Sequence, residues 1–276
     1  IVKAIVGREL GSFYPEKNNK IGEVIFEVKN YNVFDNIGKQ RVKNANFTLK
    51  KGEILGISGL IGSGRTELIS SIFGTYEGSK TGECIFNGKK INIKSAKEAL
   101  KTGISMVPED RKQDGIIADM SVEKNMTLSN LDSYTKAADY VDTYREKTDV
   151  RRYIDLLKIK TTSEDLAIKN LSGGNQQKVV LAKNLLVNPK IIILDEPTRG
   201  VDVGAKYEIY KNIVELAERG ISVIMVSSEL PEVLGISDRI IVMHEGEIKG
   251  EFINKDVTQE MIMEAAIVGG RNESGN

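Results

Sequence analysis

Two adjacent carboxylates, Asp195 and Glu196, directly follow the four apolar residues 191–194. A short apolar run of this kind predicts a buried parallel strand, and open α/β sheets bind their ligands at the carboxyl ends of such strands. One carboxylate at that position suits a hydrated Mg²⁺, and its neighbour suits the activation of a water molecule. The pair therefore predicts metal-assisted hydrolysis, and the alternative is a solvated turn after a core strand.

A glycine-rich segment lies between a predicted strand at residues 53–58 and a predicted helix at residues 65–73. Its N–H groups and the helix start would hold a phosphate group, and the Thr66 hydroxyl would bind Mg²⁺. Arg65 stands where the Gly-x4-Gly-Lys-Ser/Thr pattern has Lys, and its planar fork does not reproduce a compact ammonium. The segment predicts phosphate binding, leaves catalysis open, and has a glycine turn without a ligand as its alternative. Its residues are Gly59, Leu60, Ile61, Gly62, Ser63, Gly64, Arg65 and Thr66.

A second segment with glycines, the adjacent Gly173 and Gly174, lies at the start of the predicted helix at residues 174–186. The free N–H groups and the positive end of the dipole make such a helix start an anion-binding site. An ordinary helix start without a ligand is the alternative. The segment consists of Leu171, Ser172, Gly173, Gly174, Asn175 and Gln176.

Residues 171–178 and 195–202 together resemble the signature loop and the Walker B strand of ABC-transporter ATPases. The residues of these two segments are most similar to those in the ATP-binding subunits of bacterial monosaccharide importers for ribose, galactose or xylose. Residues 108–112 and 160–163 look most like the xylose importers. The resemblance covers about residues 4–270.

The resemblance implies that residues 59–66 bind the phosphates of ATP and that Thr66 and Asp195 hold Mg²⁺. It implies that Glu196 polarises the attacking water. Two cassettes would sandwich ATP, so that residues 171–176 of one face the γ-phosphate held by the other. Asp202 would lie in the D-loop that crosses to the opposite cassette, and it also suits the N-cap of the next helix.

Two positions differ from the family pattern. Glu109 stands where the family has a Gln that reaches Mg²⁺ and senses the membrane subunit, with a solvated loop as the alternative for Glu109 and Asp110. Ser228 occupies the place of a His that touches the γ-phosphate in most ABC ATPases. The only histidine, His244, is predicted to be a turn residue rather than a catalytic one.

Short strands are predicted at residues 24–28, 45–49 and 84–86, and Asn87-Gly88 predicts a two-residue hairpin turn. They resemble the antiparallel β subdomain of ABC ATPases, where an aromatic side chain usually stacks on adenine. Phe34 is the candidate for this role and Tyr31 the reserve, although either could equally be a core or surface residue.

The predicted fold class is α/β: a P-loop NTPase core of the ABC type with an antiparallel β subdomain and a helical subdomain near residues 115–170. Residues 24–270 would form this cassette, and residues 271–276 a tail. Residues 1–23 would be a linker or the tail of a preceding cassette. The sequence Ala-Ile-Val-Gly at residues 4–7 recurs at residues 266–269. Either two tandem cassettes in one polypeptide or coincidence would explain this repeat. Further elements are predicted as helices at 95–101 and 258–266, strands at 104–107, 222–226 and 239–243, and a hairpin at 245–252.

Composition excludes several classes of protein. Lys plus Arg and Asp plus Glu both number 39, so no basic excess points to nucleic acid. The single cysteine, Cys84, cannot form an internal disulfide and suits a reducing compartment. No apolar run approaches the ~18 residues that span a bilayer, and no signal peptide is visible. The chain begins at Ile1 rather than Met, which favours a fragment.

The expected function is the second cassette of a monosaccharide importer's ATPase subunit, which uses ATP and Mg²⁺ to drive separate permease subunits. The other cassette would lie in the same polypeptide or in a homodimer, and an extracellular sugar-binding protein would act indirectly. The place of action would be the cytoplasmic face of the bacterial plasma membrane. A regulatory module that mainly donates its signature loop, and an ABC protein acting on ribosomes or DNA, remain as alternatives.

Overall fold

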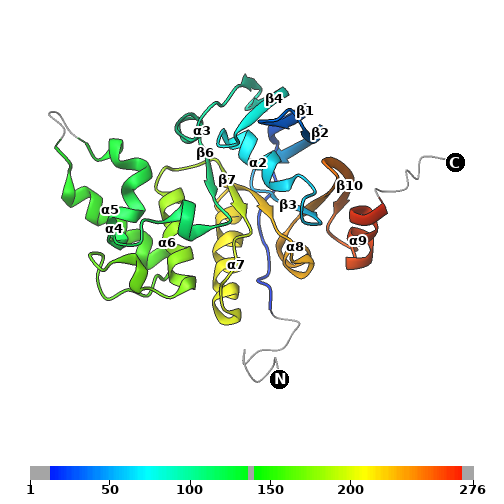
Figure 1. The fold of residues 1–276 in the computed structure, drawn as a ribbon. Coiled ribbons are helices and arrows are strands. Elements are labelled where there is room, and N and C mark those ends of the chain that lie inside the picture. The colour runs from blue at the N-terminus through cyan, green and yellow to red at the C-terminus, as the bar shows by residue number, and fades with distance from the viewer. Residues whose placement is uncertain (1–12, 136–139, 269–276) are drawn as a thin grey trace.

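A six-stranded sheet forms the centre of the computed structural model, which describes residues 13–135 and 140–268 (Figure 1). Five strands run parallel, and the edge strand β10 pairs antiparallel with β9, in the order β10-β9-β3-β8-β7-β6. All residues of β7 and β8 are buried, as expected for parallel strands covered on both faces. The strands are β3 (Ile54–Gly59), β6 (Ile104–Val107), β7 (Ile191–Asp195), β8 (Ser222–Val226), β9 (Arg239–His244) and β10 (Glu247–Ile253).

A second, antiparallel sheet has the order β2-β1-β4-β5 and confirms the predicted β subdomain. The turn at Asn87 and Gly88 joins β4 to β5, and both residues have the positive φ that such a turn requires. The first strand is longer than the predicted residues 24–28, because it bends at irregular pairings and continues to Asp35. The strands are β1 (Val24–Asp35), β2 (Gln40–Lys50), β4 (Gly78–Phe86) and β5 (Lys89–Ile91).

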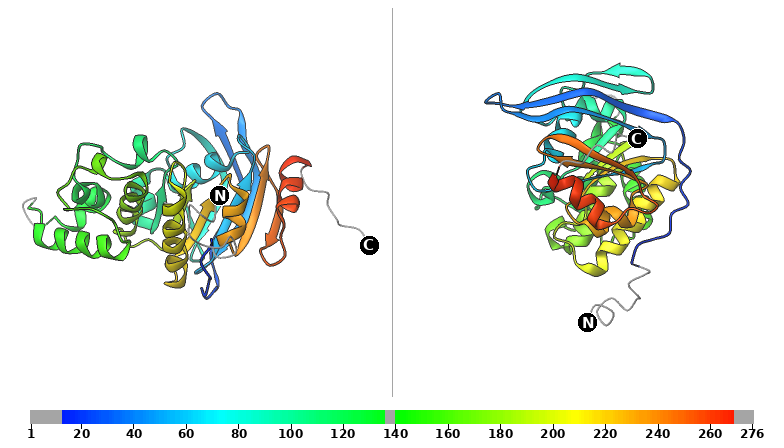
Figure 2. Two further views of the ribbon diagram at one scale, coloured as in Figure 1. Left: turned by 90° about the horizontal axis from the view of Figure 1, so that it is seen from below. Right: turned by 90° about the vertical axis from the view of Figure 1, so that its right-hand side faces the viewer.

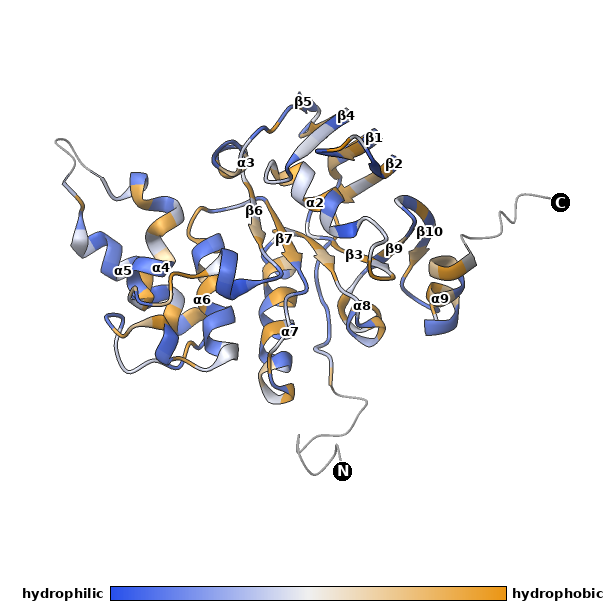
Figure 3. Cartoon of the chain, in the orientation of Figure 1, coloured by the Kyte–Doolittle hydropathy of each residue, from blue (hydrophilic) through white to orange (hydrophobic). Residues whose placement is uncertain are grey.

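Helices cover both faces of the central sheet and divide its apolar contacts into two cores (Figures 1 and 3). One core joins the sheet to α2 and the antiparallel sheet and contains the buried Cys84. The other joins the sheet to α6, α7, α8 and α9. The helices named here are α2 (Arg65–Phe73), α3 (Ala96–Thr102), α6 (Gly173–Leu185), α7 (Val203–Glu218), α8 (Leu230–Ile236) and α9 (Gln259–Val268).

The helical side of the molecule projects away from the antiparallel sheet (Figures 1 and 2). Helices joined by irregular chain form much of the segment predicted as mainly helical, and the longest of them has 14 residues. A polar network ties two of them together, because the fully buried Glu146 accepts hydrogen bonds from Lys124 at 3.1 Å and Thr127 at 2.7 Å. The elements are η2 (Arg111–Gly115), α4 (Val122–Thr127), η3 (Leu128–Ser133), α5 (Thr143–Leu156) and η5 (Ile168–Asn170).

The described part of the predicted linker, residues 13–23, lies along the central domain and makes specific contacts. Tyr14 packs on Tyr210 with ring centroids 5.2 Å apart. Lys17 donates to Asp238 at 2.9 Å, and Asn19 donates to the same carboxylate at 2.8 Å. The first copy of the four-residue repeat and the predicted tail 271–276 lie outside the described residues.

Candidate functional site

The loop between β3 and α2 is fixed by close packing that only glycine permits. A Cβ at Gly59 would lie 2.4 Å from the Met243 carbonyl oxygen, and one at Gly64 would lie 2.7 Å from the Arg41 carbonyl oxygen. Gly64 is also the N-cap of α2 with φ of 98°, and no side chain caps this helix start. The backbone N–H groups at the start of the nine-residue helix are therefore available to an anion, as the sequence predicts.

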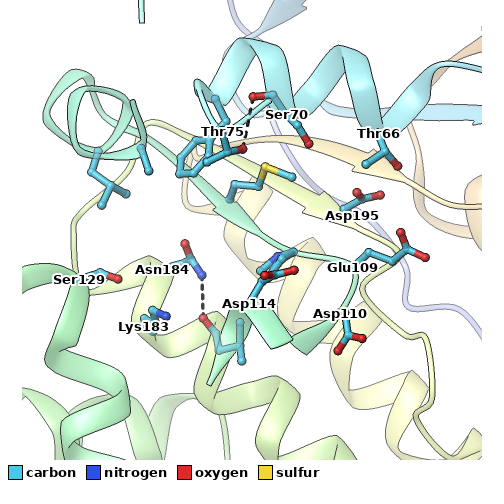
Figure 4. Close-up of a pocket in the computed structure, with 16 residues that line it drawn as sticks. Thr66, Ser70, Thr75, Glu109, Asp110, Asp114, Ser129, Lys183, Asn184 and Asp195 are labelled. Carbon is cyan, nitrogen blue, oxygen red and sulfur yellow. Dashed lines mark hydrogen bonds between the residues drawn. The ribbon is translucent and has the colours of Figure 1, made fainter. Parts of the chain in front are cut away.

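The Asp195 carboxylate lies at the tip of β7 in the same cavity as Thr66 (Figure 4). The side chain is buried, and neither of its oxygens makes a hydrogen bond of ordinary geometry in the described structure, but the Thr66 hydroxyl lies close enough to lower the pKa of the carboxyl group. Burial, reinforced by the neighbouring Glu196, raises the pKa of Asp195 to about 6. An unpartnered buried charge is costly, and a cation would relieve that cost.

These two residues fit a hydrated Mg²⁺. The described residues contain no group of three or more His, Cys, Asp or Glu side chains able to hold a metal. A cation beside Asp195 and Thr66 would thus take its other ligands from water and a bound phosphate, which is the way Mg²⁺ is usually held.

Glu196 and Arg65 face each other beside this carboxylate. Arg65 Nη1 lies 3.8 Å from Glu196 Oε1, and both side chains are largely buried. Glu196 Oε1 also accepts a hydrogen bond of 2.8 Å from the backbone N–H of Ser228. The Glu196 backbone adopts φ of 46°, held by its N–H donating to the Val226 carbonyl at 2.9 Å. The structure thus brings together the residues predicted for the phosphate, the water and the switch position.

Arg65 keeps one unused donor in this site. Its Nη1 is buried and has no hydrogen-bond partner among the described residues, and burial lowers the pKa of the guanidinium. Such a donor suits a phosphate oxygen, which accepts charge-assisted hydrogen bonds from arginine.

Sequence reasoning missed Glu232, which connects the tips of two strands. Its carboxylate accepts a hydrogen bond of 3.0 Å from Thr198 and a short one from Ser227. Thr198 follows the Asp-Glu pair and Ser227 precedes Ser228, so this buried group fixes the two loops that carry Glu196 and its partner. Its signal in the sequence was a glutamate four residues after Ser228, at a helix start.

We expect Glu232→Gln to have a higher free energy of unfolding than wild type at pH 8, and the difference should be smaller at pH 5. Burial raises the pKa of Glu232 to about 7, against hydrogen bonds that lower it. A raised pKa means that the group's contribution to stability is present below pH ~4.5 and is lost as the pH rises through ~7. Glutamine carries no charge, so the variant should gain roughly 1–3 kcal/mol over wild type at pH 8 in urea unfolding.

The exposed Glu77 offers the matched control Glu77→Gln, which changes the same charge at a surface position. Equal pH profiles for wild type and Glu232→Gln would show that Glu232 does not titrate in this range.

Glu109 lines the same cavity of about 520 Å³ (Figure 4). Its carboxylate forms an ion pair with Arg199, and both side chains are partly exposed, so the solvated loop remains the alternative interpretation. Lys183 and Asn184 of α6 contribute the opposite wall. The Asp110 carboxylate caps η2 by accepting from the N–H groups of Lys112 and Gln113.

None of residues 171–176 lines this cavity. The side chains of this segment secure the loop itself: Ser172 accepts from Asn175 at 2.9 Å, and Gln176 donates to the Leu171 carbonyl at 3.2 Å. A Cβ at Gly174 would lie 2.7 Å from Cβ of Ala205, so the loop packs tightly on α7. Asp202 caps α7 by accepting from the Ala205 N–H at 3.0 Å, as predicted.

The aromatic candidates differ in exposure. Tyr31 is only 3% exposed within the second core, so the reserve candidate for adenine stacking is wrong. Phe34 is half-buried near the end of β1 and remains a prediction. His244 is the last residue of β9, not a turn residue, and its Nδ1 lies 2.7 Å from the Ala266 carbonyl oxygen.

A glycine loop before a helix, a buried Asp-Glu strand tip and a second sheet beside the core define the nucleotide-binding domain of an ABC ATPase. Residues 42–199 match the ABC transporter family. The chain belongs to this family.

Among the relatives of this chain are ATP-binding proteins of xylose import. The chain is 52% identical over 269 residues to the xylose import ATP-binding protein XylG of Photobacterium profundum. It is 50% identical over 269 residues to the protein of the same name from Escherichia coli (strain K12). Both alignments cover 97% of this chain and 53% or 52% of the relative, so the chain spans about half the length of these relatives.

Solved structures agree with the fold. A nucleotide-free ATP-binding cassette from an ABC transporter superposes with a TM-score of 0.75 at 23% identity, covering 89% of this chain and 97% of that one. The dimeric ATP-binding cassette MJ0796 in a post-hydrolysis state, bound to ADP and Pi, gives 0.72 at 25% identity, covering 84% of this chain and all of that one. No helix in the described part of the chain is long and apolar enough to cross a membrane.

Proposed function

We propose that this chain is the second ATP-binding cassette of a monosaccharide importer, with xylose as the sugar. It binds and helps to hydrolyse ATP, and the energy drives a separate membrane permease supplied by an extracellular binding protein. The observation that carries the proposal is the buried Asp195 carboxylate beside Thr66, next to a helix start whose N–H groups no side chain caps. The 52% identity to xylose import proteins supports the choice of sugar.

The residues divide the chemistry between them. The N–H groups of residues 59–66 and the Arg65 guanidinium hold the phosphates, and Thr66 and Asp195 hold Mg²⁺, which would neutralise phosphate charge. One carboxylate oxygen of Glu196 accepts a hydrogen bond from the Ser228 N–H, and the Glu196 carboxylate orients the attacking water. Ser172 to Gly174 face the γ-phosphate held by a partner cassette, in the same polypeptide or in a homodimer. The assembly would act at the cytoplasmic face of the plasma membrane.

A mainly regulatory cassette is the second candidate. Arg65 replaces the usual Lys, and both Arg65 and the Ser228 N–H already approach the Glu196 carboxylate. Single-turnover hydrolysis with ATP held at this site separates the two candidates, because a regulatory cassette would bind ATP without cleaving it.

The proposed function is tested by ATP-driven uptake of labelled xylose, ribose and galactose into vesicles that carry the complete transporter. Xylose should be taken up preferentially. Absence of any ATP-driven sugar uptake would contradict the proposal.

We expect Glu196→Gln to lower steady-state ATP hydrolysis in these vesicles by less than the ~10²–10⁴-fold that loss of a sole general base causes. The reason is that the partner site carries most turnover. Phosphate release from vesicles of equal protein content measures the effect. A complete loss of hydrolysis from this one substitution would show that the site is not secondary.

A further inference from the structure

Three loops of different function meet at one guanidinium. Arg111 is the first residue of η2, two positions after Glu109. Its Nη1 donates to the Arg199 carbonyl at 2.8 Å, and its Nη2 donates to the Gly200 carbonyl at 3.2 Å. Both carbonyls belong to the turn that leads from the Asp-Glu strand tip to Asp202. The planar guanidinium of Arg111 therefore binds two consecutive backbone carbonyls.

The same guanidinium supports the signature loop. A Cβ at Gly173 would lie 2.8 Å from Arg111 Nη2 and 3.3 Å from the Gly200 carbonyl oxygen. Residue 173 therefore packs closely against the end of the Arg111 side chain and the Gly200 carbonyl. Gly200 adopts φ of 65°, a conformation that glycine reaches without strain.

The position of Arg111 is itself fixed from both sides. The Asp110 side chain caps η2, and a Cβ at Gly115 would meet Arg111 Cβ at 3.2 Å and Val180 at the same distance. The ion pair between Glu109 and Arg199 joins the same two segments a second time. The junction is therefore built from backbone and packing, with the guanidinium at its centre.

We propose that Arg111 is a positioning residue that makes the loop after β6, the D-loop and the signature loop move as one unit. The first of these loops lines the cavity of this chain's own site, and the other two face the partner cassette. Occupancy at one site would thereby set the geometry offered to the other. The inference rests on the proposed function, since it assumes an ATP sandwich between two cassettes.

The test compares Arg111→Ala, Arg111→Lys and the control Lys112→Ala in the complete transporter. Arg111→Ala should lower kcat for ATP hydrolysis and sugar uptake by about 10–100-fold, as small displacements of reacting groups do. Mg-ATP affinity of the chain should change by less than about twofold, since Arg111 does not contact the phosphate loop. Arg111→Lys should not restore turnover, because an ammonium cannot reproduce the fork.

The neighbouring Lys112 is exposed and carries the same charge, so Lys112→Ala should stay within about twofold of wild type. Unchanged turnover in Arg111→Ala, or an equal loss in Lys112→Ala, would overturn the inference while wild-type uptake still supported the proposed function. A wild-type transporter without ATP-driven uptake would instead refute the proposed function itself.

A double-mutant cycle with Gly173→Ala tests the contact directly. The added methyl group would displace the end of the Arg111 side chain, so Gly173→Ala should reduce turnover in wild type and much less in the Arg111→Ala background. The same loss in both backgrounds would show that the two residues are not coupled.

Discussion

Gly173→Asp is expected to abolish ATP-driven sugar uptake, with a loss of at least ~10²-fold, comparable to losing a group that stabilises transition-state charge. The new side chain would begin 2.8 Å from Arg111 Nη2 and 3.3 Å from the Gly200 carbonyl oxygen. Its carboxylate would occupy the place where the partner's γ-phosphate approaches, and it would attract Arg111 away from the D-loop carbonyls. Uptake and ATP hydrolysis are measured together in reconstituted vesicles.

Arg65→Ala provides the comparison. It removes a charge from a phosphate loop that already has no Lys, and we expect a substantial fraction of uptake to remain. Thermal melting of both variants shows whether each is folded. If Arg65→Ala were as damaging as Gly173→Asp, the two sites of the sandwich would be equivalent, and this cassette could not be mainly a signature donor.

Asp195→Asn is expected to stabilise the chain without nucleotide and to remove its response to Mg-ATP. The pKa of Asp195 is raised to about 6, so the group's contribution to stability is lost as the pH rises from ~4 through ~6. At pH 8 the buried, charged carboxylate destabilises the fold. Replacing it with the neutral amide should raise the free energy of unfolding by roughly 1–2 kcal/mol. The gain is smaller than the full shift because the amide also lies buried with few partners.

The response to nucleotide should change in the opposite direction. Wild type should melt higher with millimolar Mg-ATP, since a ligand that binds only the folded state stabilises it. Asp195→Asn should show no such shift. Asp155→Asn on the exposed face of α5 is the matched control and should keep the shift. Retention of the Mg-ATP shift in Asp195→Asn would exclude Asp195 as the metal ligand.

Local sequence patterns predicted the central sheet well, because its strands are short, apolar and bounded by clear turn and cap residues. The helix predicted at residues 95–101, for example, is α3, which Ser95 caps and Gly103 ends with φ of 95°. The site residues could be named because phosphate and metal chemistry requires particular residue types at a fixed spacing. Asp195, Thr66 and Gly64 are such cases.

Contacts between distant segments could not be predicted in this way. The length of β1 depends on irregular pairing with β2 and β4, which no local pattern encodes. The roles of Glu232 and Arg111 depend on partners 34 and 88 residues away in the chain. Tyr31 is the core residue that the sequence left as an alternative, because one aromatic residue in a strand does not show which face it lies on.

The buried position of Cys84 makes the chain convenient for site-specific labelling. Burial raises the pKa of its thiol to about 11, so almost no reactive thiolate exists at neutral pH. A cysteine introduced at the 84% exposed Tyr144, away from the phosphate loop, would therefore react with a fluorophore in preference to the native one. Energy transfer between such labels on two cassettes could follow their approach and separation during turnover without a cysteine-free background.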